Sequence, residues 1–173
     1  MKEIEKNPTA AKALIALGSN LGDSAAIIRD AFGRLEKLSA ASICKSSLWK
    51  TEPVNCPPGS PLFVNAAVAL TPLPEETPES LLAKLQTLEK EFGRRPKMVL
   101  NEPRPLDLDL IAFGNEMRNT PELVLPHPRA HLRRFVLQPL SEIAPDFLLP
   151  GQPFSIRALL ASLPSGETTL RLA

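Results

Sequence analysis

The stretch EPRPLDLDLIAFG, residues 102–114, combines the pattern of a buried strand with two carboxylates. A strand alternates its side chains between two faces, so three leucines share one face: Leu106, Leu108 and Leu110. Asp107 and Asp109 lie on the other face, together with Ile111. Because buried charge is costly unless it is paired or binds a metal, either a cation compensates these aspartates or their face is open to solvent.

In the segments before this strand, the spacing of hydrophobic residues alternates between the period typical of strands and that typical of helices. We predict, in chain order, a strand at 13–20, a helix at 25–38, strands at 42–51 and 63–71, a helix at 78–92 and the aspartate strand at 106–113. Asp23 or Ser24 is suited to cap the first helix, and Gly93 to end the second. This β-α-β-β-α-β order predicts an α+β fold, an antiparallel sheet with helices on one face in a ferredoxin-like arrangement.

Downstream of the aspartate strand, short helices are expected around 133–141 and 155–162, followed by a loose polar tail. The chain shows no internal repeat and no linker. We therefore expect a flexible N-terminal extension over 1–12, a single domain over 13–163 and a C-terminal tail over 164–173.

Composition limits the class of protein. The chain has 173 residues, of which 43% are hydrophobic and 23% charged, as in ordinary globular domains. A net charge of +1 favours neither nucleic acid nor an acidic membrane. The charged N-terminus leads into a short apolar run, so we expect neither a signal peptide nor a membrane anchor. Cys44 and Cys56 lack metal or redox spacing, which is typical of free thiols in a reducing cytoplasm.

Asp107 and Asp109 are placed to share a cation. Residues i and i+2 of a strand have Cα atoms roughly 6.6 Å apart on the same side, so their carboxylates can converge on one or two ions. Oxygen ligands suit magnesium, which also binds substrate phosphates. The Asp-x-Asp pattern alone favours a solvated sheet face that carries two aspartates.

The neighbouring basic residues favour a polyphosphate site instead. They precede and follow the aspartate strand: Arg94, Arg95, Lys97 and Arg104, then His127, Arg129, His131, Arg133 and Arg134. Magnesium ligands flanked by guanidinium groups are what polyphosphate chemistry requires. No G-x-x-x-x-G-K-[ST] loop occurs, so a nucleotide must be held by another device, and Gly18 to Asn20 is interpreted as a structural turn.

A second group of residues could bind a flat heterocycle. Thr51, Phe63 and Asn65 lie where two predicted strand ends meet, and Phe135 follows the distal arginines. Two rings can stack on a heterocycle while an amide binds its edge. Composition alone favours the alternative, in which both phenylalanines belong to the core.

Five stretches, in this order and spacing, closely resemble the 6-hydroxymethyl-7,8-dihydropterin pyrophosphokinase family of folate biosynthesis: ALIALGSNLGD, FVNAAVAL, LEKEFGR, PRPLDLDLIAFGNE and LPHPRAHLRRFVLQPLSEIAPDF. The resemblance covers about residues 13–150. It implies a ferredoxin-like α/β/α sandwich with a mainly antiparallel sheet. It also implies transfer of the β,γ-pyrophosphoryl group of ATP to the pterin hydroxymethyl, which gives the pterin diphosphate and AMP.

The resemblance also implies roles for individual residues. Asp107 and Asp109 match the ligands of two Mg²⁺ ions, and Arg94 and Arg104 match groups that act with them in catalysis. The residues expected around ATP are Gln86, Glu89, Arg94, Arg104, Leu110, His127 and Arg133. Those expected around the pterin are Thr51, Val54, Phe63, Asn65 and Phe135, with the two rings sandwiching the bicycle. Only small-molecule partners are implied, and we expect a monomer, with a weak dimer as the alternative.

The basic loop that forms a lid in this family departs from the family pattern. A tryptophan and a glycine are common where this chain has Asn101 and Glu102, and a second arginine is replaced by Pro96, next to Arg95. We therefore expect a lid that closes less favourably. A catalytically weakened pterin- or nucleotide-binding module is the alternative function. An RNA-binding ferredoxin-like domain is a third interpretation, but the predicted strands lack stacking aromatics and a basic face.

Overall fold

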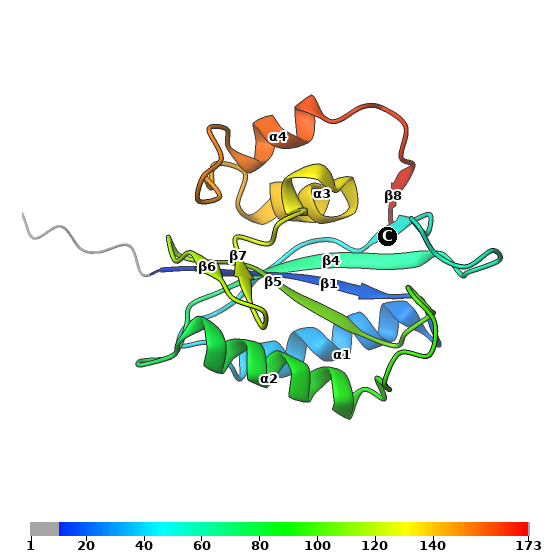
Figure 1. Ribbon diagram of the computed structural model, residues 1–173, viewed down its shortest axis with the longest axis horizontal. Coiled ribbons are helices and arrows are strands. Elements are labelled where there is room, and N and C mark those ends of the chain that lie inside the picture. The colour runs from blue at the N-terminus through cyan, green and yellow to red at the C-terminus, as the bar shows by residue number, and fades with distance from the viewer. Residues whose placement is uncertain (1–10, 173) are drawn as a thin grey trace, which may run out of the picture.

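An antiparallel sheet lies between two pairs of helices in the computed structural model, which describes residues 11–172 (Figure 1). Helices α1 (Ser24–Glu36) and α2 (Pro78–Glu91) cover one face, and α3 (Arg134–Ile143) and α4 (Ile156–Ser162) cover the other. The predicted α/β/α sandwich is confirmed. The arrangement with helices on one face, suggested by element order alone, is wrong, because the two C-terminal helices bury their apolar residues against the second face.

The main sheet has the strand order β5-β1-β4-β3-β8, and β2 pairs with β4 beside this path. Its strands are β1 (Ala13–Ser19), β2 (Cys44–Lys45), β3 (Trp49–Thr51), β4 (Phe63–Leu70), β5 (Asp107–Phe113) and β8 (Thr169–Arg171). A separate ribbon is formed by β6 (Arg118–Asn119) and β7 (Val124–Leu125), and a short 3-10 helix spans Ala130–Leu132. The aspartate strand β5 is therefore the neighbour of β1 and forms one edge of the sheet.

The two faces of β5 separate as its period of two predicts. Leu108 and Leu110 are buried in the core shared with α1 and α2, while Ile111 is buried in the core shared with α3 and α4. Each fully buried leucine or isoleucine contributes about 1.5–3 kcal/mol relative to an exposed one. Burial on both sides fixes the register of β5, since a one-residue slip would exchange its faces.

Side-chain caps set the starts of the two helices below the sheet. Asp23 accepts a hydrogen bond from the Ala26 N–H and caps α1, as the sequence predicted. Thr77 and Ser80 form a reciprocal capping box at the start of α2. Gly93 follows this helix with a φ of +92°, a conformation that glycine adopts without strain.

The expected strand over 42–51 is divided in the structure. Lys45 pairs with Val68 and Trp49 with Asn65, so the segment from Lys45 to Trp49 contains one residue more than the facing stretch of β4. Ser46 lies at this irregularity, and its hydroxyl accepts a hydrogen bond from the Ala67 N–H at 2.8 Å. A bulge of this kind bends the strand and disrupts the ladder locally, and here the Ser46 hydroxyl gives the Ala67 N–H a partner.

The C-terminal segment is more ordered than the sequence predicted. Residues 1–10 of the expected N-terminal extension lie outside the described part of the chain. The tail over 164–173, expected to be loose, contains β8, which pairs with β3 through Thr51 and Thr169. The Leu172 N–H also donates to the Leu48 carbonyl at 2.8 Å. Backbone pairing to an otherwise open sheet edge orders this segment, although its composition is polar.

Candidate active site

The register of the central strands brings the predicted site residues together. Gly18 of β1 pairs with Asn65 of β4 on one side and with Asp107 of β5 on the other. Directly paired residues of antiparallel strands point to the same face of the sheet. Asn65, Asp107 and Asp109 therefore share one face of the sheet. Ala67 and Ile111 on this face pack in the core with α3 and α4, which cover it in Figure 1.

A cavity of about 560 Å³ opens on this face. It lies between the sheet, the start of α3 and the loops over 52–62 and 94–105. The sequence-predicted residues that line it are Thr51, Val54, Phe63, Asn65, Arg104, Asp107, Asp109, Arg133 and Phe135. Both groups of predicted residues, those for a polyphosphate and those for a heterocycle, therefore meet in a single cavity.

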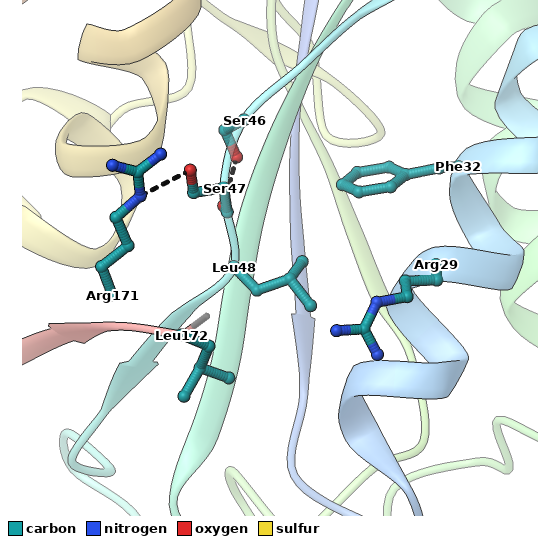
Figure 2. A pocket seen from close by; sticks show the side chains of 7 residues that line it. All are labelled: Arg29, Phe32, Ser46, Ser47, Leu48, Arg171 and Leu172. Atoms are coloured by element: carbon teal, nitrogen blue, oxygen red, sulfur yellow. Dashed lines mark hydrogen bonds between the residues drawn. The ribbon is translucent and has the colours of Figure 1, made fainter.

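A second cavity, of about 590 Å³, lies on the opposite side of the sheet (Figure 2). Figure 2 shows Arg29 and Phe32 of α1 facing Leu48, while Arg171 bonds Ser47 on the far side of the strand. No carboxylate and none of the predicted site residues line this cavity. The acidic, basic and aromatic groups that support chemistry therefore belong to the first cavity.

Asn65 and Thr51 form a buried polar pair at one end of the first cavity. The Asn65 side-chain N–H donates to the Thr51 hydroxyl at 2.6 Å, and both residues are at most 6% exposed. Gly18 lies next to this pair, and a Cβ on Gly18 would be 3.2 Å from the Asn65 amide oxygen. Gly18 thus keeps space beside an amide edge, a role that its interpretation as a turn residue missed.

Asp107 and Asp109 occupy the other end and have unlike environments. Burial would raise the pKa of Asp107, but Arg104 and Arg94 outweigh it and hold that pKa below its ordinary value. Arg104 lies 3.2 Å from one carboxylate oxygen, and Arg94 bonds the other. Burial, with the nearby charge of Asp107, raises the pKa of Asp109 to about 6. Two such carboxylates together attract further positive charge.

Glu89 supports this end of the site from α2, behind the sheet. One Glu89 oxygen accepts hydrogen bonds from the Leu108 N–H at 2.7 Å and from the Arg94 guanidinium at 2.9 Å. Burial raises the pKa of Glu89 to about 7. Glu89 thus positions Arg94 against Asp107, and it does not itself line the cavity.

Each cavity phenylalanine has an arginine over its ring. The Arg104 guanidinium carbon lies 5.3 Å from the centre of the Phe63 ring, and that of Arg133 lies 5.4 Å from the centre of the Phe135 ring. These distances are within the range of cation–π attraction. The arginines therefore join the aromatic and acidic parts of the cavity.

Asn20 joins the bases of the two loops that border the cavity, a role that the sequence did not indicate. Its amide oxygen accepts the Arg104 backbone N–H at 2.9 Å, and its own backbone N–H donates to the Arg104 carbonyl at 3.1 Å. Its side-chain N–H donates to the Pro61 carbonyl at 3.4 Å. Asn20 is 2% exposed, so it is a buried clamp that fixes the backbone of Arg104.

With this geometry in view, the chain was compared with known proteins. The family model described as 7,8-dihydro-6-hydroxymethylpterin-pyrophosphokinase (HPPK) matches residues 14–145, which contain all the sequence-predicted site residues. The chain belongs to the HPPK family. The family and the enzyme class that the sequence predicted are therefore confirmed.

Two bacterial relatives of similar length carry the name 2-amino-4-hydroxy-6-hydroxymethyldihydropteridine pyrophosphokinase. The Bacillus subtilis protein is 41% identical over 76% of this chain and 77% of its own length. The Methylorubrum extorquens protein is 37% identical over 90% of this chain and 96% of its own length. The folic acid synthesis protein fol1 of Pneumocystis carinii is 38% identical over 82% of this chain, but the chain spans only 19% of that protein.

Solved HPPK-DHPS structures share the fold. One, crystallised in complex with substrates, superposes with a TM-score of 0.68 at 13% identity, over 88% of this chain and 43% of its own. The wild-type Plasmodium falciparum HPPK-DHPS with pteroate gives a TM-score of 0.68 at 14% identity, over 87% of this chain and 42% of its own. These likenesses confirm the predicted ferredoxin-like fold and nothing beyond the fold.

Five residues expected near ATP lie outside the cavity lining: Glu89 and Arg94, described above, and Gln86, Leu110 and His127. Gln86 is exposed on α2, and Leu110 is buried in the core on the opposite face of β5. His127 lies in the loop before the 3-10 helix, where its backbone N–H donates to the Ile111 carbonyl at 2.9 Å. Burial, followed by the charges of Arg133 and Arg129, lowers the pKa of His127 to about 4. His127 is therefore neutral at pH 7.

The loop over 94–105, which the resemblance implies is a lid, forms contacts through the residues that depart from the family pattern. Asn101 has a φ of +54°, and its side-chain N–H donates to the Asn55 carbonyl at 2.7 Å, across to the other loop. The Glu102 carboxylate accepts the Met98 N–H at 3.0 Å. Leu100, which is 76% exposed, lines the cavity. The departures noted in the sequence thus make specific contacts within and between the two loops.

The donor set of the site fits magnesium. Among residues 11–172 no group of three or more His, Cys, Asp or Glu side chains forms a metal site by itself. Asp107 and Asp109 offer carboxylate oxygens on one face, and Mg²⁺ commonly takes only one or two carboxylates and fills its remaining positions with water and phosphate oxygens.

No helix in the described part of the chain is long and apolar enough to cross a membrane.

Proposed function

We propose that this chain transfers the pyrophosphoryl group of ATP to 6-hydroxymethyl-7,8-dihydropterin within the cavity between Asn65 and Asp109. The reaction gives AMP and the pterin diphosphate. The family and the relatives named above support the reaction, and the arrangement of groups along the cavity supports its location. The acidic and basic residues bind the phosphates, while the buried amide and the two rings bind the pterin.

One observation carries the assignment of the phosphate end. The Arg104 Nε is buried and has no hydrogen-bond partner among the described residues, although the same guanidinium contacts Asp107 and lies over Phe63. A buried N–H without a partner is costly, so a ligand oxygen is expected there. A phosphate oxygen matches this donor in charge and geometry.

The pterin end follows from hydrogen-bonding capacity. The Thr51 hydroxyl accepts an N–H from Asn65 and thereby orients the Asn65 amide, whose oxygen lies beside Gly18. A ring between Phe63 and Phe135 would bring its polar edge to that amide. Val54 borders the same space.

The mechanism is positioning combined with electrostatic stabilisation. Asp107 and Asp109 would hold Mg²⁺, which when bound neutralises charge on the phosphate oxygens. Arg104 and Arg133 contact the phosphates directly, and Arg94, held by Glu89, stabilises the carboxylate pair. The pterin hydroxymethyl oxygen attacks the β-phosphorus, the bond from that phosphorus to the α,β-bridging oxygen breaks, and AMP leaves. The proton of the hydroxyl is lost to solvent or to phosphate, since no side chain is placed as an obligatory base.

The test is AMP release from ATP in the presence of the hydroxymethyl dihydropterin and Mg²⁺. We expect turnover in the wild type and a loss of at least about 100-fold in Asp109→Asn, consistent with removal of one charged group that stabilises a transition state. Asp30→Asn, on the exposed surface of α1, is the matched control and keeps full activity. Binding of both substrates without AMP release in the wild type would instead favour the catalytically weakened binding module.

We further propose that the chain works in the cytoplasm as a monomer. Cys44 and Cys56 are both free thiols in the structure, in accord with a reducing compartment. Sedimentation at concentrations from micromolar to millimolar tests the monomer against a weak dimer.

A further inference from the structure

We propose that Glu167, in the C-terminal segment outside the family match, contacts the pterin by accepting a hydrogen bond from its 2-amino group. The proposal rests on the proposed function. The family model ends at residue 145, so Glu167 has no counterpart in it. Glu167 nevertheless lines the same cavity as Asn65 and Phe135.

The segment that carries Glu167 is fixed at both ends. On one side, an Arg134 guanidinium N–H donates to the carbonyls of Leu163 and Pro164, each at 3.3 Å. On the other side, β8 pairs with β3, and Figure 1 shows this last part of the chain running from α4 down to the edge of the sheet. A short segment held at two points keeps its side chains in place at low entropic cost.

The pairing of β8 brings Glu167 to the pterin end of the cavity. Thr169 lies directly opposite Thr51, the residue whose hydroxyl accepts the Asn65 N–H. Glu167 precedes Thr169 by two residues, so it reaches the cavity at the corner where Thr51 and Asn65 lie. In the strand order, β1 separates the acidic pair on β5 from Asn65, and β1 and β4 separate it from Thr51.

The chemistry of Glu167 suits the edge of a pterin and not a phosphate. The carboxylate forms no salt bridge with any residue of 11–172, and its side chain is exposed. An ionised carboxylate only accepts hydrogen bonds, and the 2-amino group of a pterin only donates them. A negative charge also repels a triphosphate, so Glu167 favours the orientation in which the phosphates lie at the arginine end.

The test compares two ligands and three variants of the full chain by calorimetry, with Mg²⁺ and a non-hydrolysable ATP analogue present. The ligands are 6-hydroxymethyl-7,8-dihydropterin and its analogue without the 2-amino group. We expect Glu167→Ala to weaken pterin binding about five- to twentyfold, as for loss of a hydrogen bond to a charged but solvated group, with a smaller effect for Glu167→Gln. Binding of the analogue stays unchanged. Glu122→Gln, which removes an exposed charge on the β6–β7 turn, is the matched control.

Equal pterin affinity of the wild type and Glu167→Ala overturns the proposal, as does an equal loss for both ligands. Affinity for the ATP analogue reports whether the variant keeps an intact site, and the exposed position of Glu167 makes loss of folding unexpected. Failure of the proposed function is a separate result, because the wild type itself would then release no AMP from ATP and pterin. Pterin affinity is measured without turnover, so the Glu167 comparison still decides the proposal if the wild type binds pterin but releases no AMP.

Discussion

Asn65 and Thr51 are joined by a buried side-chain hydrogen bond of 2.6 Å across β4 and β3. The bond uses an amide N–H of Asn65, and no donor among residues 11–172 bonds to the amide oxygen. Thr51 is itself held by backbone pairing with both Phe63 and Thr169. The Asn65 oxygen is thus a fixed acceptor at the end of the cavity proposed to bind the pterin.

Replacing Asn65 with Ala should remove this acceptor and cost about 1–3 kcal/mol of pterin affinity, because the ligand edge loses its partner inside a buried site. Affinity for an ATP analogue should change little, since the arginine end is untouched. Calorimetry with each ligand measures both effects, and Asn119→Ala in β6 is the exposed control. An equal loss for the two ligands means that Asn65 only supports the fold.

Asp107 and Asp109 should respond in opposite ways when each is changed to Asn in the absence of metal. The pKa of Asp107 is lowered by its arginines, so its charged form stabilises the fold and Asp107→Asn should lower Tm at pH 8. The pKa of Asp109 is raised to about 6, so its ionisation opposes folding and Asp109→Asn should raise Tm at pH 8. Neither variant should show near-normal turnover at saturating Mg²⁺.

The pH dependence of the Asp109 effect has a defined window. A carboxyl whose folded pKa is raised favours the folded state below its unfolded pKa of 3.8, and this contribution is lost as pH rises through about 6. The stability gain of Asp109→Asn over the wild type should therefore grow between about pH 4 and pH 6 and then level off. Denaturant unfolding in EDTA across this range measures it. A gain that is constant over this range contradicts the assigned pKa.

Much of this site could be predicted because its residues lie in local patterns. The period of two in β5 separates Leu108 from Asp109, and the spacing of leucines along α2 predicts its buried face. Strand β8 could not be predicted, because the polar segment around Thr169 is ordered only by pairing with the distant β3. Contacts that join residues far apart in the chain leave no period in the sequence.

Asn20 is the clearest case of a role that the sequence did not indicate. Its partner Arg104 is 84 residues away, and a buried Asn after a strand is otherwise typical of a turn. We expect Asn20→Ala to lower turnover about tenfold and to destabilise the fold by about 1–3 kcal/mol, since the Arg104 N–H and the Pro61 carbonyl lose their partners. Asn20→Asp keeps the acceptor for Arg104 but loses the donor to Pro61.

The Asn20 variants are measured by AMP release and by denaturant unfolding. If Asn20 positions Arg104, the Asp variant should retain more turnover than the Ala variant while both lose stability. If the loss of turnover in each variant is simply proportional to its loss of unfolding free energy, Asn20 does not position Arg104.

Variants of the loop over 94–105 can show how this chain functions without the tryptophan and glycine that are common there in its family. Asn101 adopts a φ of +54°, which Asn and Gly tolerate and which costs a bulky residue about 1–2 kcal/mol. The Asn101–Asn55 hydrogen bond joins the two loops, and Leu100 supplies apolar surface to the cavity. We predict that these two features replace an aromatic cover over the pterin. The prediction from sequence, that the loop closes less favourably, is tested by the same variants.

Asn101→Gly separates the two properties of Asn101, since Gly keeps the positive φ and removes the side-chain bond to Asn55. We expect pterin to dissociate about three- to tenfold faster from this variant, as for loss of one partly exposed hydrogen bond of about 1 kcal/mol. Asn101→Trp should fail to increase turnover, because backbone strain offsets the added aromatic burial. Stopped-flow measurement of pterin release and steady-state AMP production determine both results. Unchanged release from Asn101→Gly, together with faster turnover of Asn101→Trp, means that the loop closes through an aromatic cover and not through the Asn101–Asn55 contact.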